Sequence, residues 1–153
     1  MDSSIKPIYL LSLIPVDPGN VKTIHLAASD FFSPIYSSLN ESSKPYVLYV
    51  GQRSGYKNFF NFCRAFSQSN ILRNEFNIHV FGGGKFNKSE LQELDELNLL
   101  KNVIKVDGDD VQLRIQYSNA RALIYPSIME GFGIPLIEAM KNLCLRLQVK
   151  VVK

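Results

Sequence analysis

The sequence is poor in cysteine and has no long apolar run. Its two cysteines, Cys63 and Cys144, match neither a metal-binding nor a redox spacing. Cys63 lies in an apolar pattern with helical spacing, so we expect a buried free thiol, which fits a reducing cytoplasm. The apolar stretch 8–16 is too short to span a bilayer, is interrupted by Pro15, and lacks the features of a signal peptide. We therefore expect a cytoplasmic protein.

The excess of positive over negative charge is also small. Seventeen Lys and Arg residues against fourteen Asp and Glu residues give a formal net charge of +3. This excess is too small to indicate a nucleic-acid-binding protein, and no basic stripe with interleaved aromatic residues is present. It does fit an anionic small ligand. With 46% apolar and 20% charged residues, the 153-residue chain has the composition of one folded globular domain.

Short apolar runs alternate with helical patterns along the chain. The predicted strands cover residues 21–27, 46–50, 77–81, 103–106 and 122–125. The predicted helices cover residues 56–68, 87–99 (opened by a capping box from Asn87 to Glu90) and 109–119, and a further helix follows Gly133. This alternation predicts an α/β fold with a Rossmann-like parallel sheet flanked by helices. Three loops, 51–57, 82–85 and 127–133, would then meet at the carboxyl ends of the strands, where ligands of such sheets bind.

The stretch 130–140 combines two carboxylates with residues that oppose a continuous helix. Glu130 and Glu138 are separated by Gly131, Gly133 and Pro135. A glycine loop that turns into a helix, with the proline near the first helical position, explains this pattern better. The backbone N–H groups and the positive end of the helix dipole would then suit a phosphate, and the carboxylates would suit hydroxyls such as those of a ribose.

Two separated segments resemble a known enzyme family. The sequence EGFGIPLIE, residues 130–138, resembles the E-x7-E motif of retaining glycosyltransferases with the GT-B fold, the group known as group 1 or family 4. The segments YPS (125–127) and YVGQRSGYKN (49–58) resemble the lead-in to that motif and the diphosphate-binding segment. The likeness covers roughly residues 20–141 and is more specific than a single motif because both segments occur in the family's order.

The resemblance implies a donor site for a nucleoside-diphosphate sugar, with no other cofactor. Arg53 and Lys57 would bind the diphosphate and stabilise the leaving group, Glu130 would contact the donor sugar, and Glu138 would bind the ribose. The residues expected to approach the donor through their backbone are Gly51, Gly82, Gly83, Gly131, Phe132 and Gly133. Simpler interpretations stay open. Arg53 and Lys57 could be solvated cations, Glu138 could only stabilise a helix N-terminus by its charge, and Glu130 could be a loop carboxylate. Residues 82–84 could form a plain tight turn.

Other motifs carry less weight. Residues 82–85 are not a P-loop, because His79 occupies the place of the early glycine and Phe86 that of the Ser/Thr. Asp107 and Asp109 match the D-x-D pattern of metal-dependent glycosyltransferases, but capping by Asp109 is the simpler explanation, and no metal is expected. In the family this stretch passes the nucleobase. His79 and the other histidine, His25, are expected to be hydrogen-bonded core residues without a catalytic role.

Two other enzyme classes are disfavoured. A glycosidase would use Glu130 and Glu138 as acid and nucleophile, but the phosphate-type loop between them argues against that pair. A nucleotide-dependent oxidoreductase would need a G-x-G-x-x-G after its first strand, which is absent.

The chain departs from the family pattern at both ends. Residues 1–20 are predicted to be a linker or remnant, 21–141 the nucleotide-sugar-binding domain, the C-terminal half of a GT-B fold, and 142–153 an atypical tail. Measured against that resemblance, the acceptor-binding half is expected to be missing from this sequence. The tail alternates apolar and polar residues and predicts a half-exposed strand rather than the buried strand that the fold needs, so the final elements are expected to be lacking.

We therefore expect a glycosyltransferase donor domain. Alternatives are a truncated or frameshifted remnant that only binds nucleotide sugar, and a subunit completed by a separate acceptor-binding chain. Marginal stability is expected of the isolated chain, and peripheral membrane association of a full-length enzyme stays open.

Overall fold

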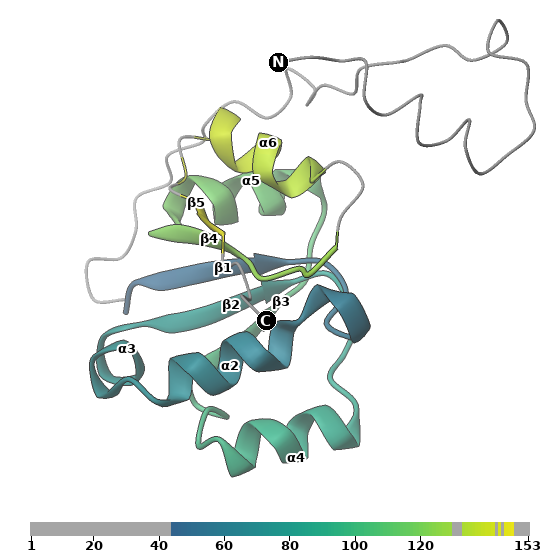
Figure 1. Ribbon diagram of the computed structural model, residues 1–153. Coiled ribbons are helices and arrows are strands. Elements are labelled where there is room, and N and C mark those ends of the chain that lie inside the picture. Colours follow the sequence, from purple (N-terminus) through teal and green to yellow (C-terminus); the bar gives the residue numbers. More distant parts are fainter. Residues whose placement is uncertain (1–43, 130–132, 143, 145, 149–153) are drawn as a thin grey trace, which may run out of the picture.

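The computed structural model describes residues 44–129, 133–142, 144 and 146–148. Within these ranges, five parallel strands form one sheet in the order β3-β2-β1-β4-β5 (Figure 1). The strands are β1 (Tyr46–Val50), β2 (Asn77–Phe81), β3 (Val103–Val106), β4 (Ala122–Tyr125) and β5 (Arg146–Gln148). The helices are η2 (Gly55–Lys57), α2 (Phe59–Ser67), α3 (Asn70–Glu75), α4 (Lys88–Glu96), α5 (Asp110–Asn119) and α6 (Ile134–Lys141). The predicted parallel α/β fold is confirmed.

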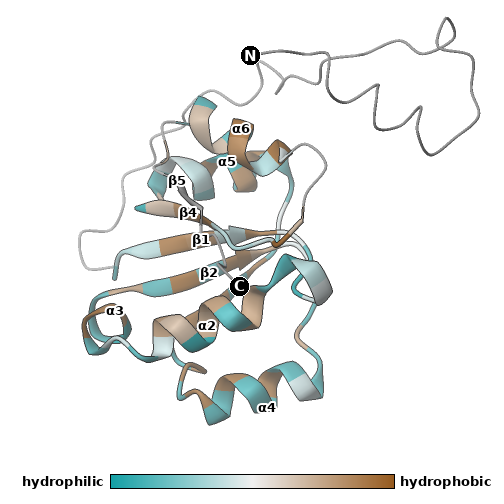
Figure 2. Cartoon of the chain, viewed as in Figure 1, coloured by the Kyte–Doolittle hydropathy of each residue, from teal (hydrophilic) through white to brown (hydrophobic). Residues whose placement is uncertain are grey.

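Helices cover both faces of the sheet. Helices α2, α3 and α4 lie on one face, and α5 and α6 lie on the other (Figure 1). Each face of the sheet has its own hydrophobic core, and strand β1 contributes to both because its side chains alternate between the faces. Val47 and Tyr49 pack with α2. Tyr46 and Leu48 pack with α5 and α6. In Figure 2 apolar and polar colours alternate along α2 and α4, as expected of helices with one buried side. Four of the five β1 residues are buried, as the apolar run 46–50 predicts.

Local sequence signals place most helix ends. The capping box is present: the Asn87 side chain accepts from the Glu90 N–H at 2.9 Å, and Glu90 accepts from the Asn87 N–H at 2.8 Å. Asp109 caps α5 by accepting from the N–H of Gln112 at 3.0 Å. A proline stands in the first turn of α6, directly after Gly133 and Ile134. These three predictions are confirmed.

Two helices differ from their predicted extents. The single helix predicted over 56–68 is divided into η2 and α2, because Asn58 takes a left-handed conformation with φ of 60°. Helix α4 ends at Glu96 rather than at residue 99, and Asn98 is left-handed just beyond that end. Helix α3 is not predicted from the sequence; Ser69 caps it by accepting from the Leu72 N–H at 3.3 Å.

The sheet continues past residue 141. Arg146–Gln148 forms β5, which pairs in parallel with β4 at the edge of the sheet. The strand predicted in the tail is therefore confirmed over these residues, and the expectation that the sheet lacks a strand after α6 is wrong. The strand predicted over 21–27 lies outside the described residues. No helix in the described ranges is both long enough and apolar enough to cross a membrane.

Candidate functional site

The loops after β1, β2 and β4 are joined by hydrogen bonds at the carboxyl edge of the sheet. The N–H of Gly51 donates to the carbonyl of Phe81 at 2.9 Å. The N–H of Ile128 donates to the carbonyl of Tyr56 at 2.8 Å, and Asn58 Nδ2 donates to the carbonyl of Pro126 at 3.1 Å. The predicted convergence of the three loops is thus confirmed for their described residues.

Arg53 is buried at this edge, with only 5% of its surface exposed. Its Nε and Nη2 atoms donate to the two carboxylate oxygens of Glu90 at 2.8 and 3.1 Å. Nη1 donates to the carbonyls of Gly82 and Gly84 at 3.3 and 3.1 Å, and Nη2 also donates to the carbonyl of Lys85 at 3.0 Å. The guanidinium lies over the ring of Phe86, 4.4 Å from its centroid.

These contacts change the interpretation of Arg53. An arginine has five N–H groups, and all five have a protein acceptor here. None is left for a diphosphate in this arrangement, so the structure does not support direct chelation by this residue. The simpler alternative, a solvated cation, is wrong because the side chain is buried.

Lys57 remains a cation at the same edge. It ends helix η2, is half-buried, and its Nζ lies 5.3 Å from the centroid of the Tyr56 ring. Lys57 also directly precedes Asn58, the N-cap residue of α2, so it stands at a helix start as the sequence predicts, where a positive charge is not favoured. Its contact with a diphosphate stays a prediction.

The turn 82–84 is formed by three consecutive glycines with positive φ, of 83°, 70° and 68°. At Gly83 a Cβ atom would lie 2.7 Å from Arg53 Nη1 and 2.8 Å from the carbonyl oxygen of Gly51. Gly83 is therefore closely approached by atoms of the protein itself, whereas the prediction concerned approach to the donor. Contact of Gly51, Gly82 and Gly83 with a ligand stays a prediction.

The start of α6 has the predicted geometry where the structure describes it. Gly133 is the N-cap residue with φ of 77°, and the Leu136 N–H donates to its carbonyl at 2.9 Å. Glu130, Gly131 and Phe132 lie outside the described residues, so the roles assigned to them stay predictions.

Glu138 is a residue of α6, and its half-buried side chain contacts α5. Its Oε2 atom accepts a hydrogen bond from the hydroxyl of Tyr117 at 2.9 Å. Burial raises the pKa of Glu138, the hydrogen bond from Tyr117 lowers it, and the nearby Asp110 raises it. Tyr117 is fully buried, and burial together with Glu138 raises the pKa of its hydroxyl. The carboxylate is thus held by a partner on the neighbouring helix.

Sequence reasoning misses three residues that hold the predicted site residues or their loops in place: Glu90, Asn58 and Tyr117. Glu90 is predicted only as a capping residue. Tyr117 follows Leu113 by four positions, which places both on one helical face and could have indicated its burial. Nothing local indicates that Asn58 bonds the Pro126 carbonyl, 68 positions away.

The D-x-D pattern is accounted for by local contacts. Asp109 caps α5, as the simpler interpretation predicts, and Asp107 forms an ion pair with Lys105. In the part of the chain that the structure describes, no three His, Cys, Asp or Glu side chains are grouped so that they could hold a metal ion. His79 is hydrogen-bonded as predicted, its Nδ1 lying 2.8 Å from Gln116 Oε1, but it is half-buried rather than fully buried. The other histidine lies outside the described residues.

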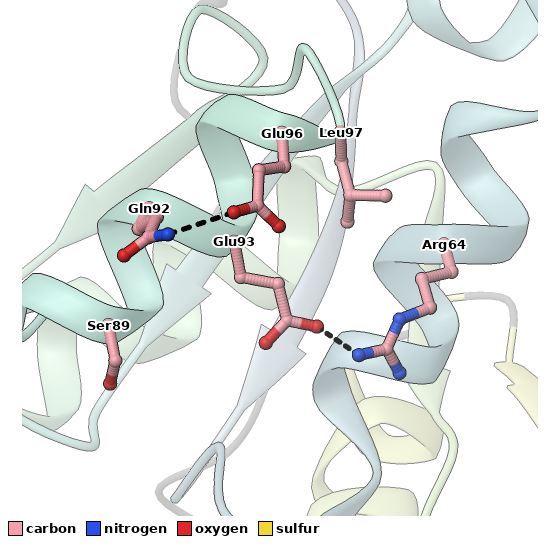
Figure 3. A pocket seen from close by; sticks show the side chains of 6 residues that line it. All are labelled: Arg64, Ser89, Gln92, Glu93, Glu96 and Leu97. Atoms are coloured by element: carbon pink, nitrogen blue, oxygen red, sulfur yellow. Dashed lines mark hydrogen bonds and ion pairs between the residues drawn. The ribbon is translucent and has the colours of Figure 1, made fainter.

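Two of the hollows in the described part of the structure border helix α2. The larger, of about 370 Å³, lies between α2 and α4 and contains none of the predicted site residues (Figure 3). In it Arg64 forms an ion pair with Glu93, and Gln92 donates to Glu96 at 2.9 Å (Figure 3). The smaller, of about 200 Å³, is partly lined by Arg53, Gly55 and Asn58. Only the smaller hollow borders the joined loops.

Comparisons with known protein families and sequences all match glycosyl transferases. The family model described as glycosyl transferases group 1 matches residues 35–147. The O-antigen chain mannosyltransferase RfbU of Salmonella typhimurium is 34% identical over 123 residues, which cover 74% of this chain and 34% of that protein. The chain thus spans about a third of the length of the curated relatives it matches.

Two solved structures show the same fold. The C-terminal domain of the group 1 glycosyl transferase LpcC from Francisella tularensis is 21% identical, with a TM-score of 0.64, over 79% of this chain and 70% of that domain. A TarM variant from S. aureus, in complex with fondaparinux, α-GlcNAc-glycerol and UDP, is 16% identical, with a TM-score of 0.67, over 95% of this chain and 28% of TarM.

Proposed function

This chain belongs to the group 1 glycosyl transferases, and we propose that it is the donor-binding domain of an enzyme that transfers a sugar from a nucleoside diphosphate to an acceptor hydroxyl with retention. The observation that carries the proposal is the joining of the loops after β1, β2 and β4 at one edge of the sheet, next to the start of α6. The mannosyltransferase relative and the UDP bound to TarM support a nucleotide hexose as the class of donor.

In this proposal the diphosphate lies at the N-terminus of α6, with Lys57 beside it. The bond between the anomeric carbon and the diphosphate breaks, and its electron pair stays on the diphosphate oxygen. Lys57 and the backbone N–H groups at the helix start stabilise that charge. The acceptor oxygen bonds the anomeric carbon on the same face, and its proton passes to the departing diphosphate, so no protein base is assigned. Glu130 orients the donor sugar.

Glu138 takes the ribose in this proposal. A carboxylate offers about four acceptor positions, and Tyr117 occupies one of them. The ribose hydroxyls would donate to the others. Because Tyr117 fixes the carboxylate before the donor arrives, less side-chain entropy is lost on binding.

Calorimetric titration with a panel of nucleoside-diphosphate sugars tests the proposal. We expect one or more donors to bind, and Lys57→Ala and Glu138→Ala each to weaken that binding roughly 10- to 100-fold, the value of a hydrogen bond to a charged group. Lys101→Ala is the matched control, because Lys101 is exposed and precedes β3, at the opposite edge of the sheet. Full affinity in both site variants, or no binding by the unaltered chain, would overturn the proposal.

A second candidate is a protein that binds nucleotide sugar without transferring the sugar by itself. The chain spans 34% of the length of its mannosyltransferase relative. The acceptor-binding part would then come from another chain, or transfer would not occur. Measuring sugar transfer with and without a co-expressed acceptor-binding half separates these cases: transfer only in the presence of both favours a divided enzyme.

A further inference from the structure

We propose that Glu90 and Arg53 form a positioning pair, the Arg53–Glu90 clamp, that turns the backbone N–H groups of the loop 82–86 toward the donor. The inference rests on the proposed function, because it assumes that an anionic donor binds at this edge. It replaces direct chelation by Arg53 and gives a role to Glu90 beyond capping α4.

Glu90 is held from two sides. Both of its carboxylate oxygens accept from Arg53, and Oε2 also accepts from the N–H of Asn87 at 2.8 Å. Only 13% of its side chain and 4% of that of Arg53 are exposed. The hydrogen bond from Arg53 is the main reason why the pKa of Glu90 lies below its ordinary value. The clamp therefore ties the loop after β1 to the first turn of α4, a rigid element.

The carbonyls that Arg53 binds determine where the loop's N–H groups point. In a trans peptide the C=O of one residue and the N–H of the next point in opposite directions. No peptide bond is cis in the described part of the chain. The carbonyls of Gly82, Gly84 and Lys85 point at the guanidinium, so the N–H groups of Gly83, Lys85 and Phe86 point away from it.

Those three N–H groups are available to a ligand. Within the described ranges none of them donates to a protein acceptor. Backbone N–H groups of a turn that lack a protein acceptor can bind an anion, and those of Lys85 and Phe86 are successive. These N–H groups would donate to oxygen atoms of the donor, either of its diphosphate or of a sugar hydroxyl.

The test compares Glu90→Gln and Arg53→Lys with a second ion pair made by the same helix α4. Arg64 of α2 and Glu93 of α4 form this pair with 53% and 29% of their side chains exposed, so Glu93→Gln and Arg64→Lys are the controls. Glu90→Gln keeps an acceptor for Asn87, and Arg53→Lys keeps the charge but loses the planar fork. Circular dichroism selects a temperature at which every variant is folded.

Two measurements are made on each protein. Hydrogen exchange of the amides of residues 82–86 is followed with and without the tightest donor of the panel, and donor affinity is measured by calorimetry. Because these amides have no protein acceptor among the described residues, we expect them to exchange fast in every donor-free variant. We expect the two clamp variants to weaken donor affinity roughly tenfold and to lose the protection that saturating donor gives these amides. The controls should leave both unchanged. A role in stability alone would leave the donor's protection of these amides intact.

The outcomes separate the two proposals. If saturating donor protects residues 82–86 as well in both clamp variants as in the unaltered chain, the clamp is overturned. Unchanged donor affinity in both clamp variants overturns its positioning role. If the unaltered chain binds no donor at all, the proposed function itself is overturned; if it binds donor and the clamp variants bind it equally well, only the clamp is overturned.

Discussion

Replacing Gly83 by alanine tests how closely the loops after β1 and β2 are packed. Gly83 and Gly84 have nearly the same φ, 70° and 68°, so an alanine at either position adopts an unfavourable left-handed conformation that costs about 1–2 kcal/mol. Their surroundings differ. A Cβ at Gly84 meets no atom within 4 Å, whereas a Cβ at Gly83 would lie 2.8 Å from the Gly51 carbonyl oxygen and 2.7 Å from Arg53 Nη1.

The clash at Gly83 cannot be relieved by a small movement. Arg53 is held by five hydrogen bonds, and the other close atom belongs to the backbone. Overpacking of this kind costs about 1–3 kcal/mol in addition to the backbone strain. We therefore expect Gly83→Ala to lower the free energy of unfolding by about 2 kcal/mol more than Gly84→Ala does. For a chain of this size that difference lowers the melting temperature by a further 4–8 °C or so.

Urea unfolding followed by circular dichroism measures both variants against the unaltered chain. A common slope in urea allows the midpoints to be converted to free energies. The reasoning is refuted if the two alanine variants unfold within about 0.5 kcal/mol of each other, since the shared strain would then account for everything.

Two further predictions concern the α5 side of the sheet. Tyr117→Phe removes the hydrogen bond to Glu138, so stability should fall by about 1–3 kcal/mol and the pKa of Glu138, measured by NMR titration, should rise further; an unchanged pKa would contradict the contact. The pKa of His79 is lowered from 6.5, chiefly by burial, so below pH 6.5 the unfolded chain binds a proton that the folded chain resists. Stability should therefore fall with pH from about 6.5 downward, by at most about 1.4 kcal/mol per pH unit. The difference in unfolding free energy between the unaltered chain and His79→Asn should shrink over that range, and a constant difference would count against it.

The parts of the fold that sequence predicts are those governed by near neighbours. The capping box from Asn87 to Glu90 and the cap at Asp109 involve residues three positions apart, so spacing alone indicates them. The run 46–50 indicates a buried strand because every residue in it is apolar. The convergence of three loops follows from parallel strand order, which the alternation of strands and helices already implies.

What sequence cannot supply is the partner of a side chain. Arg53 is a cation in a loop whichever acceptors it finds, and its acceptors lie 29–37 positions away. A ligand's phosphate and the protein's own carbonyls are equally plausible from the residue type alone. Asn58 is similar: its left-handed conformation divides the predicted helix, and its amide reaches the loop after β4. Such residues are recognised only once distant segments are placed together.

The strand order has a consequence for where a ligand can enter. From β1 the chain adds β2 and β3 on one side, then returns to add β4 and β5 on the other. The helix that follows β1 therefore covers one face, and the helix that follows β4 covers the opposite face (Figure 1). The segments that follow the adjacent strands β1 and β4 therefore leave the sheet toward opposite faces. In parallel sheets a crevice forms between two such segments at the carboxyl ends of the strands, and it needs no cavity in the core. Changes of loop length or composition there would alter what the crevice accepts while leaving both hydrophobic layers untouched.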